Sequence, residues 1–358
     1  MDHALRRSRL AGRLAELGVD AIFVTRLPNV RYLTGFTGSN AQALLSPDAT
    51  VFFTDGRYEE QSRHEVPDAE RITYLDGFPP VAPVVADRGL SRIGFEPEGV
   101  TFGFWERLRG HLDGAELVPV GTEVERLRRS KEPDELDRIA GAQEATDAAF
   151  ERVVLDGRLR TGMTERDLAF ELEVAMRHAG ADDKAFDPIV AFGEGAAEPH
   201  HEPSGRELRR GDVVKLDFGA LVEGYHSDMT RTVAFGEPDG RLRAIHDLVA
   251  EAQRAGIDAV RPGATVAEVD LAARRVIEGG GLAERFPHGL GHGVGLEIHE
   301  APRLRWDGSE DVPLGAVVTI EPGVYIPGLG GVRIEDMVEV TEDGCRQIPR
   351  STKELVVL

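Results

Sequence analysis

The stretch DVVKLDFGALVEGYHSDMTRTVAF, residues 212–235, consists of two β-type runs on either side of Gly224. A second stretch, AVVTIEPGVYIPGLGGVRIEDMVEVT, residues 316–341, repeats the arrangement about the glycines at 328–331. Runs rich in β-branched and aromatic residues that flank a glycine turn are typical of antiparallel hairpins. The two stretches therefore predict two hairpins, and the helical patterns outside them predict an α+β domain of duplicated architecture.

Each predicted hairpin carries two acidic residues within apolar, strand-like sequence. Asp217 and Asp228 lie 228 − 217 = 11 residues apart, on opposite arms of the first hairpin, and Glu321 and Glu335 occupy the second. One such residue is consistent with an acid at a strand edge or turn. Four of them favour a metal site, because a carboxylate in an apolar environment is costly to bury unless it is paired or binds a cation.

The donor set predicts which metals bind and what they do. Four carboxylates and an imidazole are rich in oxygen, which suits Mn²⁺, Co²⁺ or Zn²⁺ better than a metal selected by thiolates. The set is larger than one catalytic metal ion needs. It therefore favours two ions about 3.5–4 Å apart that hold a hydroxide between them, and this arrangement serves hydrolysis.

The imidazole comes from HGLGHGVGLEIHE, residues 288–300, where three histidines lie in a glycine-rich segment. The glycines disfavour both a regular helix and an ordinary packed strand. Taken alone, the segment is equally consistent with a solvated turn. Its position between the two hairpins favours a second interpretation, in which the glycines let the backbone approach a crowded metal centre.

Composition limits the class of protein. A chain of 358 residues favours two domains, and 63 acidic against 42 basic residues, a net charge of -21, disfavour nucleic acid and anionic membranes as partners. The single cysteine, Cys345, allows no intramolecular disulfide and predicts a reducing, cytoplasmic location. The sequence contains no run of about 18 apolar residues, so it predicts no membrane-spanning helix. The opening MDHALRRSRLAGRLAELGVD predicts an amphipathic helix.

The chain divides into two predicted domains, at residues 1–125 and 126–358. In the first, the β-type runs at 21–25 and 51–54 alternate with helical patterns, which predicts an α/β domain with a mostly parallel or mixed sheet. In the second, a helix over 130–150 is expected to have Ser130 as its cap and Pro133 in its first turn. Further helices are predicted over 165–179, 241–260 and 265–279.

Several motifs resemble one known family. In order along the chain, they are PHHEPSGRELRRGDVVKLDFGA, YHSDMTRT, HGLGHGVGLEIHE, TIEPGVY and GVRIEDM. Together they closely resemble the pita-bread metallopeptidases of the aminopeptidase P and prolidase branch. RYLTGFTGSNA and FTDGRYEEQ also resemble the N-terminal, creatinase-like domain of that branch. Methionine aminopeptidases share the metal pattern but usually lack this domain. The resemblance implies an α/β N-terminal domain followed by an α+β pita-bread catalytic domain.

The resemblance also implies the metal ligands. Asp217 would bind one metal ion, Asp228 and Glu335 would bridge both ions, and His292 with Glu321 would complete the second. Glu321 is implied as the general base as well, since a ligand carboxylate that touches the bridging water can accept its proton.

Other residues receive roles toward the substrate. His200 and His299 match family histidines that contact the substrate and stabilise the tetrahedral intermediate, and His288 is expected to contact the substrate. His201, which stands where a glycine is common, is expected to be a bystander. Arg333 lies two residues before the bridging Glu335, and is expected to point the same way along the strand and to orient that carboxylate.

The function implied is hydrolysis of the Xaa-Pro bond, with two divalent metal ions, most readily Mn²⁺, in a homodimer. Proline lacks an amide hydrogen and blocks ordinary proteases, so a pocket built for its ring is a plausible specialisation. On the resemblance of RYLTGFTGSNA we favour an Xaa-Pro aminopeptidase that acts on peptides. The alternatives are an Xaa-Pro dipeptidase (prolidase), a creatinase-like hydrolase, and a pita-bread binding protein or scaffold without peptidase activity, although such relatives typically lose metal ligands.

Overall fold

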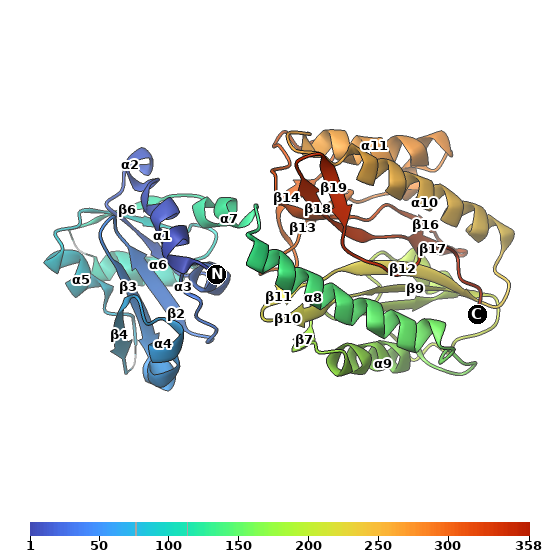
Figure 1. Ribbon diagram of the computed structural model, residues 1–358, viewed down its shortest axis with the longest axis horizontal. Coiled ribbons are helices and arrows are strands. Elements are labelled where there is room, and N and C mark those ends of the chain that lie inside the picture. The colour runs from blue at the N-terminus through green and yellow to red at the C-terminus, as the bar shows by residue number, and fades with distance from the viewer. Residues whose placement is uncertain (76, 113) are drawn as a thin grey trace. The chain divides into compact units, whose positions relative to one another are not determined.

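The computed structural model describes residues 1–75, 77–112 and 114–358. The chain forms two compact units, Met1–Arg128 and Arg129–Leu358, each with its own sheets and core (Figure 1).

The N-terminal unit contains one six-stranded sheet with the order β4-β3-β2-β1-β5-β6. Its strands are β1 (Ala21–Val24), β2 (Ala41–Leu45), β3 (Thr50–Asp55), β4 (Glu70–Tyr74), β5 (Arg92–Phe95) and β6 (Glu116–Pro119). The pairs β3–β4, β1–β5 and β5–β6 are parallel, whereas β1–β2 and β2–β3 are antiparallel. The sheet is therefore mixed, as the sequence predicts.

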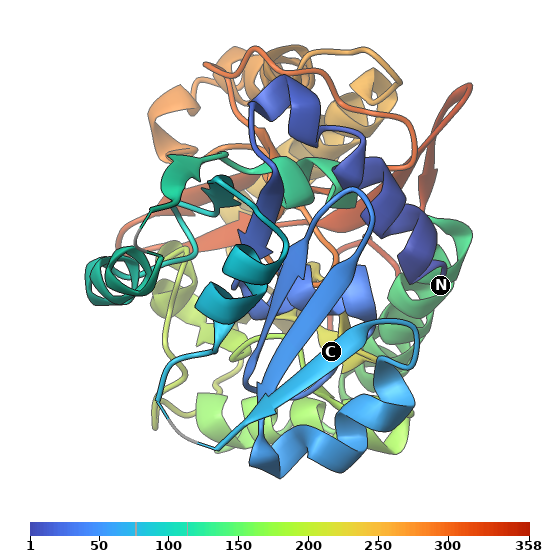
Figure 2. The same ribbon diagram turned by 90° about the vertical axis from the view of Figure 1, so that its left-hand side faces the viewer.

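Alternation along β3 explains why helices pack on both faces of this sheet. Phe53 contacts Phe23 on one face, and Phe52 contacts Phe36 on the other. The surrounding helices are α1 (His3–Ala11), α2 (Leu14–Leu17), α3 (Leu27–Thr34), α4 (Glu59–Glu65), α5 (Val81–Asp87), α6 (Phe102–His111) and α7 (Glu123–Arg128). Figure 2 shows the strands of this unit between its helices. The single first helix predicted from the sequence is wrong: α1 ends before Gly12, a residue of low helix propensity, and α2 begins two residues later.

Four long helices of the second unit lie close to their predicted ranges. They are α8 (Pro133–Phe150), α9 (Glu165–His178), α10 (Gly240–Ala259) and α11 (Val266–Gly279), and a π-turn, Glu151–Leu155, follows α8. The predicted cap of α8 is wrong. Pro133 does begin the helix, but Glu132 rather than Ser130 is the N-cap, and Glu132 and Glu135 form a capping box. Among the described helices, none combines the length and apolarity that crossing a membrane requires.

Each predicted hairpin is confirmed as an antiparallel inner pair, but its tip forms separate strands. In the aspartate hairpin (residues 212–235), β9 (Asp212–Phe218) pairs with β12 (Met229–Phe235), and the tip contributes β10 (Ala220–Val222) and β11 (Tyr225–His226). In the glutamate hairpin (residues 316–341), β15 (Val317–Ile320) pairs with β18 (Asp336–Thr341), and β16 (Gly323–Ile326) pairs with β17 (Gly330–Arg333). The backbone therefore bends between the inner pair and the tip of each hairpin.

The remaining strands extend these pairs into sheets. They are β7 (Asp183–Lys184), β8 (Ile189–Phe192), β13 (Gly291–Gly293), β14 (Glu300–Leu304) and β19 (Gly344–Gln347). One sheet has the order β12-β9-β8 and another the order β14-β13-β15-β18-β19. Helices α8 and α9 share a core with the first, and α10 and α11 share a core with the second. The strands thus lie between two helix pairs, which Figure 1 shows in green and in orange.

Candidate metal centre

One cavity of about 290 Å³ in the second unit is lined by every residue that the sequence analysis assigned to the site. These residues are His200, Asp217, Asp228, His288, His292, His299, Glu321, Arg333 and Glu335. They come from both hairpins, from the segment before β9 and from the glycine-rich segment 288–300. The structure therefore brings together residues that are up to 135 positions apart, 335 − 200 = 135.

Three of the four carboxylates lie where the two hairpins bend, and the fourth lies near the end of a strand. Asp217 is in β9 and pairs with Thr230 in the strand register, and Asp228 immediately precedes β12. Glu321 lies between β15 and β16, and Glu335 between β17 and β18. Residues at a bend leave the regular alternation of the strands, so these side chains can converge on one cavity.

His292 lies among these carboxylates in the orientation of a metal ligand. Its Nδ1 lies 3.1 Å from the carbonyl oxygen of Gly293, which can only accept a hydrogen bond. The proton is therefore on Nδ1, and Nε2 keeps its lone pair. That atom lies 3.6 Å from Asp228 Oδ2 and 3.4 Å from Glu321 Oε1. One ligand atom from each of Asp228, His292 and Glu335 lies within 4.8 Å of the others.

The protonation behaviour of the cluster fits a site that binds cations. Burial raises the pKa of Asp228 and Glu335 well above the ordinary value, and repulsion by neighbouring carboxylates adds to this. Burial likewise raises the pKa of Glu321 to about 7, against the opposing effect of the Arg333 guanidinium. Burial lowers the pKa of His292 to about 3. Asp228, Glu335 and Glu321 therefore hold protons more readily than ordinary carboxylates while the imidazole stays neutral, and a metal ion would compete with those protons.

Asp217 provides a direct test of whether the site fits a metal ion. Its Oδ2 forms an ion pair with Arg333, but its Oδ1 is buried and has no hydrogen-bond partner. A buried polar atom without a partner costs about 1–3 kcal/mol, and more when the group is charged. A cation bound to Oδ1 would remove this cost, so the donor set fits the metal pair that the sequence implies.

Arg333 contacts a different carboxylate from the one predicted. Its Nη2 pairs with Asp217, its Nε donates to Thr230 Oγ1 at 3.0 Å, and its Nη1 donates to the Tyr325 hydroxyl at 2.9 Å. Glu335 instead accepts a hydrogen bond of 2.6 Å from Thr230 Oγ1. The prediction that Arg333 orients Glu335 is wrong, because β17 ends at Arg333 and strand alternation does not continue through the bend.

The other histidines lie at the cavity with different freedom to act. The ring centroid of His299 lies 4.4 Å from that of His292, and burial lowers its pKa. Both nitrogens of His288 have partners in the protein: Nδ1 lies 2.8 Å from the carbonyl oxygen of Gly289, and Nε2 lies 2.9 Å from the Tyr325 hydroxyl. His288 can therefore offer a substrate mainly the surface of its ring.

The neighbouring residues His200 and His201 differ sharply. His200 lines the cavity. His201 contacts Glu165 at 3.0 Å and Glu198 at 2.7 Å, and these carboxylates raise its pKa against the lowering effect of burial. His201 is therefore part of a local ion-pair network, and only His200 faces the predicted chemistry.

The glycines around His292 allow close approach between strands. A Cβ atom on Gly291 would lie 1.9 Å from the carbonyl oxygen of Thr319, and one on Gly293 would lie 2.4 Å from that of Ala301. No side chain fits at such distances. These two positions require glycine because the neighbouring backbone lies so close, and not because of a metal ion. The close packing holds β13, which carries His292, between β14 and β15.

Sequence reasoning missed several residues of the cavity. Arg303 and Arg305 add positive charge to the lining, and Phe186, Ile189 and Ile298 add apolar surface. The signal for Arg303 was faint: it is the one basic residue of β14, a short strand of five residues. Thr230 and Tyr325 lie within two of the motifs. The contacts of their hydroxyl groups could not be predicted, because they depend on how the two hairpins pack together.

Comparison with known proteins agrees with this arrangement. Residues 137–342 match the model for metallopeptidase family M24, and residues 6–130 match the creatinase/prolidase N-terminal domain. The chain is similar to an Xaa-Pro dipeptidase from Pyrococcus horikoshii, with 34% identity over 94% of this chain and 95% of the relative.

Solved structures give the same result over nearly the whole chain. An Xaa-Pro dipeptidase from Bacillus anthracis superposes with a TM-score of 0.96 and 39% identity, covering 99% of this chain and 100% of that one. An X-Pro aminopeptidase from Thermotoga maritima superposes with a TM-score of 0.89 and 34% identity, covering 98% and 99%. With its creatinase-type N-terminal domain and its pita-bread catalytic domain, the chain belongs to metallopeptidase family M24.

Proposed function

We propose that this metallopeptidase is an Xaa-Pro dipeptidase that uses two divalent metal ions. The observation that carries the proposal is one cavity lined by four carboxylate residues, His292 and Arg303. The aminopeptidase expected from RYLTGFTGSNA has weaker support, because the curated relatives with a stated substrate are mainly Xaa-Pro dipeptidases. The dipeptidase alternative is therefore the better interpretation.

Asp217, Asp228, His292, Glu321 and Glu335 would hold the two metal ions, as the resemblance implies. Such a pair supplies a water of lowered pKa and polarises the scissile carbonyl when it is bound. The partners that orient these ligands are Arg333 on Asp217, Thr230 on Glu335, and Thr319, whose hydroxyl donates to Glu321 Oε1 at 3.1 Å. Fixed ligands of this kind keep the geometry of a site constant through the reaction.

The remaining residues handle protons and the substrate. Glu321 is the proposed general base, because its carboxylate lines the cavity beside His292 and can accept a proton from a water bound there. His200 and His299 are the proposed donors to the substrate and to the oxyanion of the tetrahedral intermediate. We place His288 beside the substrate as an aromatic wall, since its two nitrogens already have partners. Phe186 and Ile189 offer apolar surface for a proline ring.

The preference for a dipeptide rests on size and charge. At about 290 Å³, the cavity is at the lower end of the range typical for ligand sites, roughly 300–1,000 Å³. An Xaa-Pro dipeptide has a carboxylate directly after its proline, and Arg303 and Arg305 can pair with it. A longer peptide has an uncharged amide at that position. The proposed specificity is thus a charge contact that only a dipeptide makes.

The deciding experiment compares kcat/KM for three substrates: Ala-Pro, Ala-Pro-amide and Ala-Pro-Ala. A dipeptidase hydrolyses Ala-Pro best, and R303Q should lower kcat/KM for Ala-Pro by about 10–100-fold, the scale of a hydrogen bond to a charged group, with little effect on the amide. R346Q is the matched control, because Arg346 is exposed and lies outside the cavity. Preference for Ala-Pro-Ala would instead support an aminopeptidase, which the Thermotoga maritima relative favours.

The proposal also covers the identity of the metal, the location of the protein in the cell and its oligomeric state. We propose Mn²⁺ because four of the five donors are carboxylates, with Co²⁺ and Zn²⁺ as alternatives. Elemental analysis of protein purified without added metal, followed by reconstitution with each ion, would identify it. The cytoplasmic location rests on the single cysteine, and the homodimer rests on the resemblance of the motifs; light scattering of the purified protein tests the latter.

A further inference from the structure

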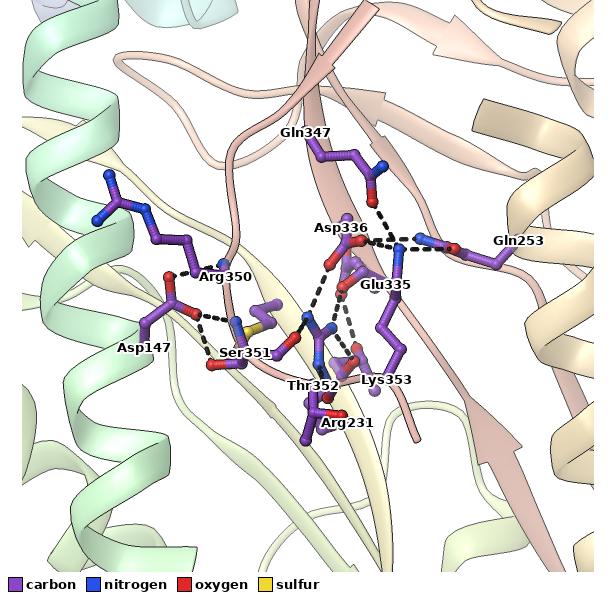
Figure 3. A network of polar contacts seen from close by, with 12 residues as sticks. Asp147, Arg231, Gln253, Glu335, Asp336, Gln347, Arg350, Ser351, Thr352 and Lys353 are labelled. Carbon is purple, nitrogen blue, oxygen red and sulfur yellow. Dashed lines mark hydrogen bonds and ion pairs between the residues drawn. The ribbon is translucent and has the colours of Figure 1, made fainter. Parts of the chain in front are cut away.

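Arg231, in β12, is buried and uses every N–H group that its side chain has. A guanidinium offers five N–H donors in a rigid plane. Here Nε donates one hydrogen bond, and Nη1 and Nη2 donate two each, at 2.6–2.9 Å. The acceptors are the backbone carbonyls of Thr230, Glu335, Ser351 and Thr352, and Oδ1 of Asp336. Figure 3 shows the guanidinium among them.

These acceptors lie on three separate segments: β12 of the aspartate hairpin, the bend before β18 of the glutamate hairpin, and the C-terminal segment 351–358. The last segment runs beside β12, where Ala234 N donates to Val356 O and Leu358 N donates to Ala234 O, each at 2.9 Å. Asp147 of α8 holds the start of this segment through the backbone amides of Arg350 and Ser351. A single buried side chain therefore joins both hairpins to the end of the chain.

Glu335 is held by two adjacent residues of β12. Its backbone carbonyl accepts from Arg231 Nη1 at 2.6 Å, and its backbone amide donates to the Thr230 carbonyl at 3.1 Å. Its carboxylate accepts from the Thr230 hydroxyl. Because the backbone of Glu335 is fixed on both sides, the position of its carboxylate depends on Arg231 as well as on Thr230.

Asp336 keeps Arg231 in place from the opposite side. It is 1% exposed; Oδ1 pairs with Arg231, and Oδ2 accepts from Lys353 Nζ at 2.7 Å and from Gln253 Nε2 at 3.1 Å. Lys353 also donates to Gln347 Oε1 at 2.6 Å. The Glu335 side chain reaches the cavity, whereas the Asp336 side chain reaches this network.

We infer that Arg231, Asp336 and residues 351–353 form a clamp that sets the distance between Asp228 and Glu335 and thereby the affinity of the metal centre. The inference rests on the proposed function, because it assumes that both carboxylates bind metal. Arg231 is a positioning residue: it touches neither the cavity nor a substrate. The C-terminal segment, for which the motifs gave no role, thus becomes part of the support of the site.

The geometry explains why lysine would not replace arginine here. A lysine carries its three N–H donors on a single nitrogen atom. The acceptors around Arg231 lie on three segments, and the three nitrogens of a guanidinium can reach all of them. Loss of the guanidinium would take from the Glu335 carbonyl and from Asp336 Oδ1 the hydrogen bonds that Arg231 donates to them. The bend that carries Glu335 could then move relative to Asp228, and ligands that are displaced bind metal more weakly.

The test measures metal binding by the full chain directly. Metal-free R231Q, R231K and wild-type protein would be titrated with Mn²⁺ against a competing chelator, and the absorption spectrum of each Co²⁺ form would report ligand geometry. We expect R231Q and R231K to bind metal about 10–100-fold more weakly, the usual scale for losing a group that orients ligands, with an altered Co²⁺ spectrum. R346Q is the matched control, since it removes an exposed guanidinium that pairs with Glu339 of the same strand, β18.

A second variant covers the case in which Arg231 variants do not fold. Lys353 is partly exposed, and K353M leaves Arg231 and its carbonyl acceptors intact while removing one partner of Asp336. We expect a smaller loss, about 2–10-fold in metal affinity, with unchanged circular dichroism. If the Arg231 variants fold and bind metal as tightly as the wild type does, the clamp is overturned. If they do not fold, the same result for K353M overturns it. If the wild type itself binds no metal, the proposed function fails instead.

Discussion

The carboxylates and two of the histidines, His200 and His299, reach the cavity from two different kinds of backbone. The carboxylates come from the two hairpins, where paired strands fix the backbone on both sides of each bend. His200 and His299 come from segments outside the strands, before β9 and between β13 and β14. Strand pairing suits residues whose mutual distances must stay constant, and irregular segments suit residues that adjust to a substrate.

The two hairpins also orient each other. Arg333 of the glutamate hairpin pairs with Asp217 of the aspartate hairpin, and Thr230 of the aspartate hairpin donates to Glu335 of the glutamate hairpin. No comparable bracing holds His299, which meets His292 only through ring contact among the described interactions. The difference agrees with the proposal that the hairpins, with His292, hold metal and that the irregular segments handle the substrate. Variants in each region should therefore fail in different ways.

The largest effect is expected from D228A in the aspartate hairpin. The change removes a proposed bridge between the two ions and leaves Glu335 without its neighbour, so activity should fall by more than about 10³-fold, with loss of bound metal. Elemental analysis and a hydrolysis assay on Ala-Pro measure both. D343A, at an exposed position in the β18–β19 turn, serves as the control. Two tightly bound metal ions with normal turnover would show that the hairpin is not the ligand frame.

The histidines outside the hairpins should fail in the opposite manner. Each of H200A and H299A should lower kcat by about 10²–10³-fold, the scale of losing one donor to the transition state, while metal content stays unchanged. H201Q distinguishes the role of His201 from that of its neighbour His200. Because His201 pairs with Glu165 and Glu198, we expect this variant to have a lower Tm rather than a lower kcat. Loss of metal from H200A or H299A would contradict the division between the two regions.

The bracing between hairpins can be tested by removing one hydroxyl. T230V removes the hydroxyl that donates a 2.6 Å hydrogen bond to the Glu335 carboxylate, and valine has nearly the same shape as threonine. Metal affinity should therefore fall by about 10-fold. T232V is the matched control on the same strand, since the Thr232 hydroxyl contacts the backbone of Arg333 and no carboxylate. Chelator competition compares the two variants. Equal metal affinity in both would remove Thr230 from the support of the site.

The smallest effect concerns pH and the metal-free protein. The folded pKa of Glu321, about 7, lies above its ordinary value of 4.5, so the stability that this group contributes is complete below about pH 4.5 and is lost as pH rises through 7. Asp228 and Glu335 shift in the same direction. The metal-free protein should therefore have a Tm a few degrees lower at pH 8 than at pH 6.

Bound metal should reverse this trend, because it replaces the protons and binds more tightly as pH rises. Calorimetry with and without Mn²⁺ at both pH values measures the difference. D228A should weaken the dependence, whereas H299A should preserve it. A metal-induced rise in Tm that is the same at pH 6 and pH 8 would show that protons and metal do not compete at the hairpins.

The sequence by itself determined the parts of the molecule that depend on local pattern. Glycine turns between β-type runs predicted both hairpins, helical sequence patterns predicted α9, α10 and α11, and carboxylates inside apolar strands predicted a metal centre. Burial of charge is penalised whatever the fold, so residue type and context were sufficient. The motifs then supplied nine of the residues that line the cavity.

Only the tertiary structure decided which groups meet. Glu132 caps α8 in place of Ser130, Arg333 pairs with Asp217 in place of Glu335, and Arg303 enters the cavity. The bond from Arg333 to Asp217 joins residues 116 positions apart, and that from Arg231 to Asp336 joins residues 105 apart. Strand alternation gives the face of a residue within one strand, but it does not continue through a bend or across to another hairpin. Contacts of that range depend on packing, which no local pattern encodes.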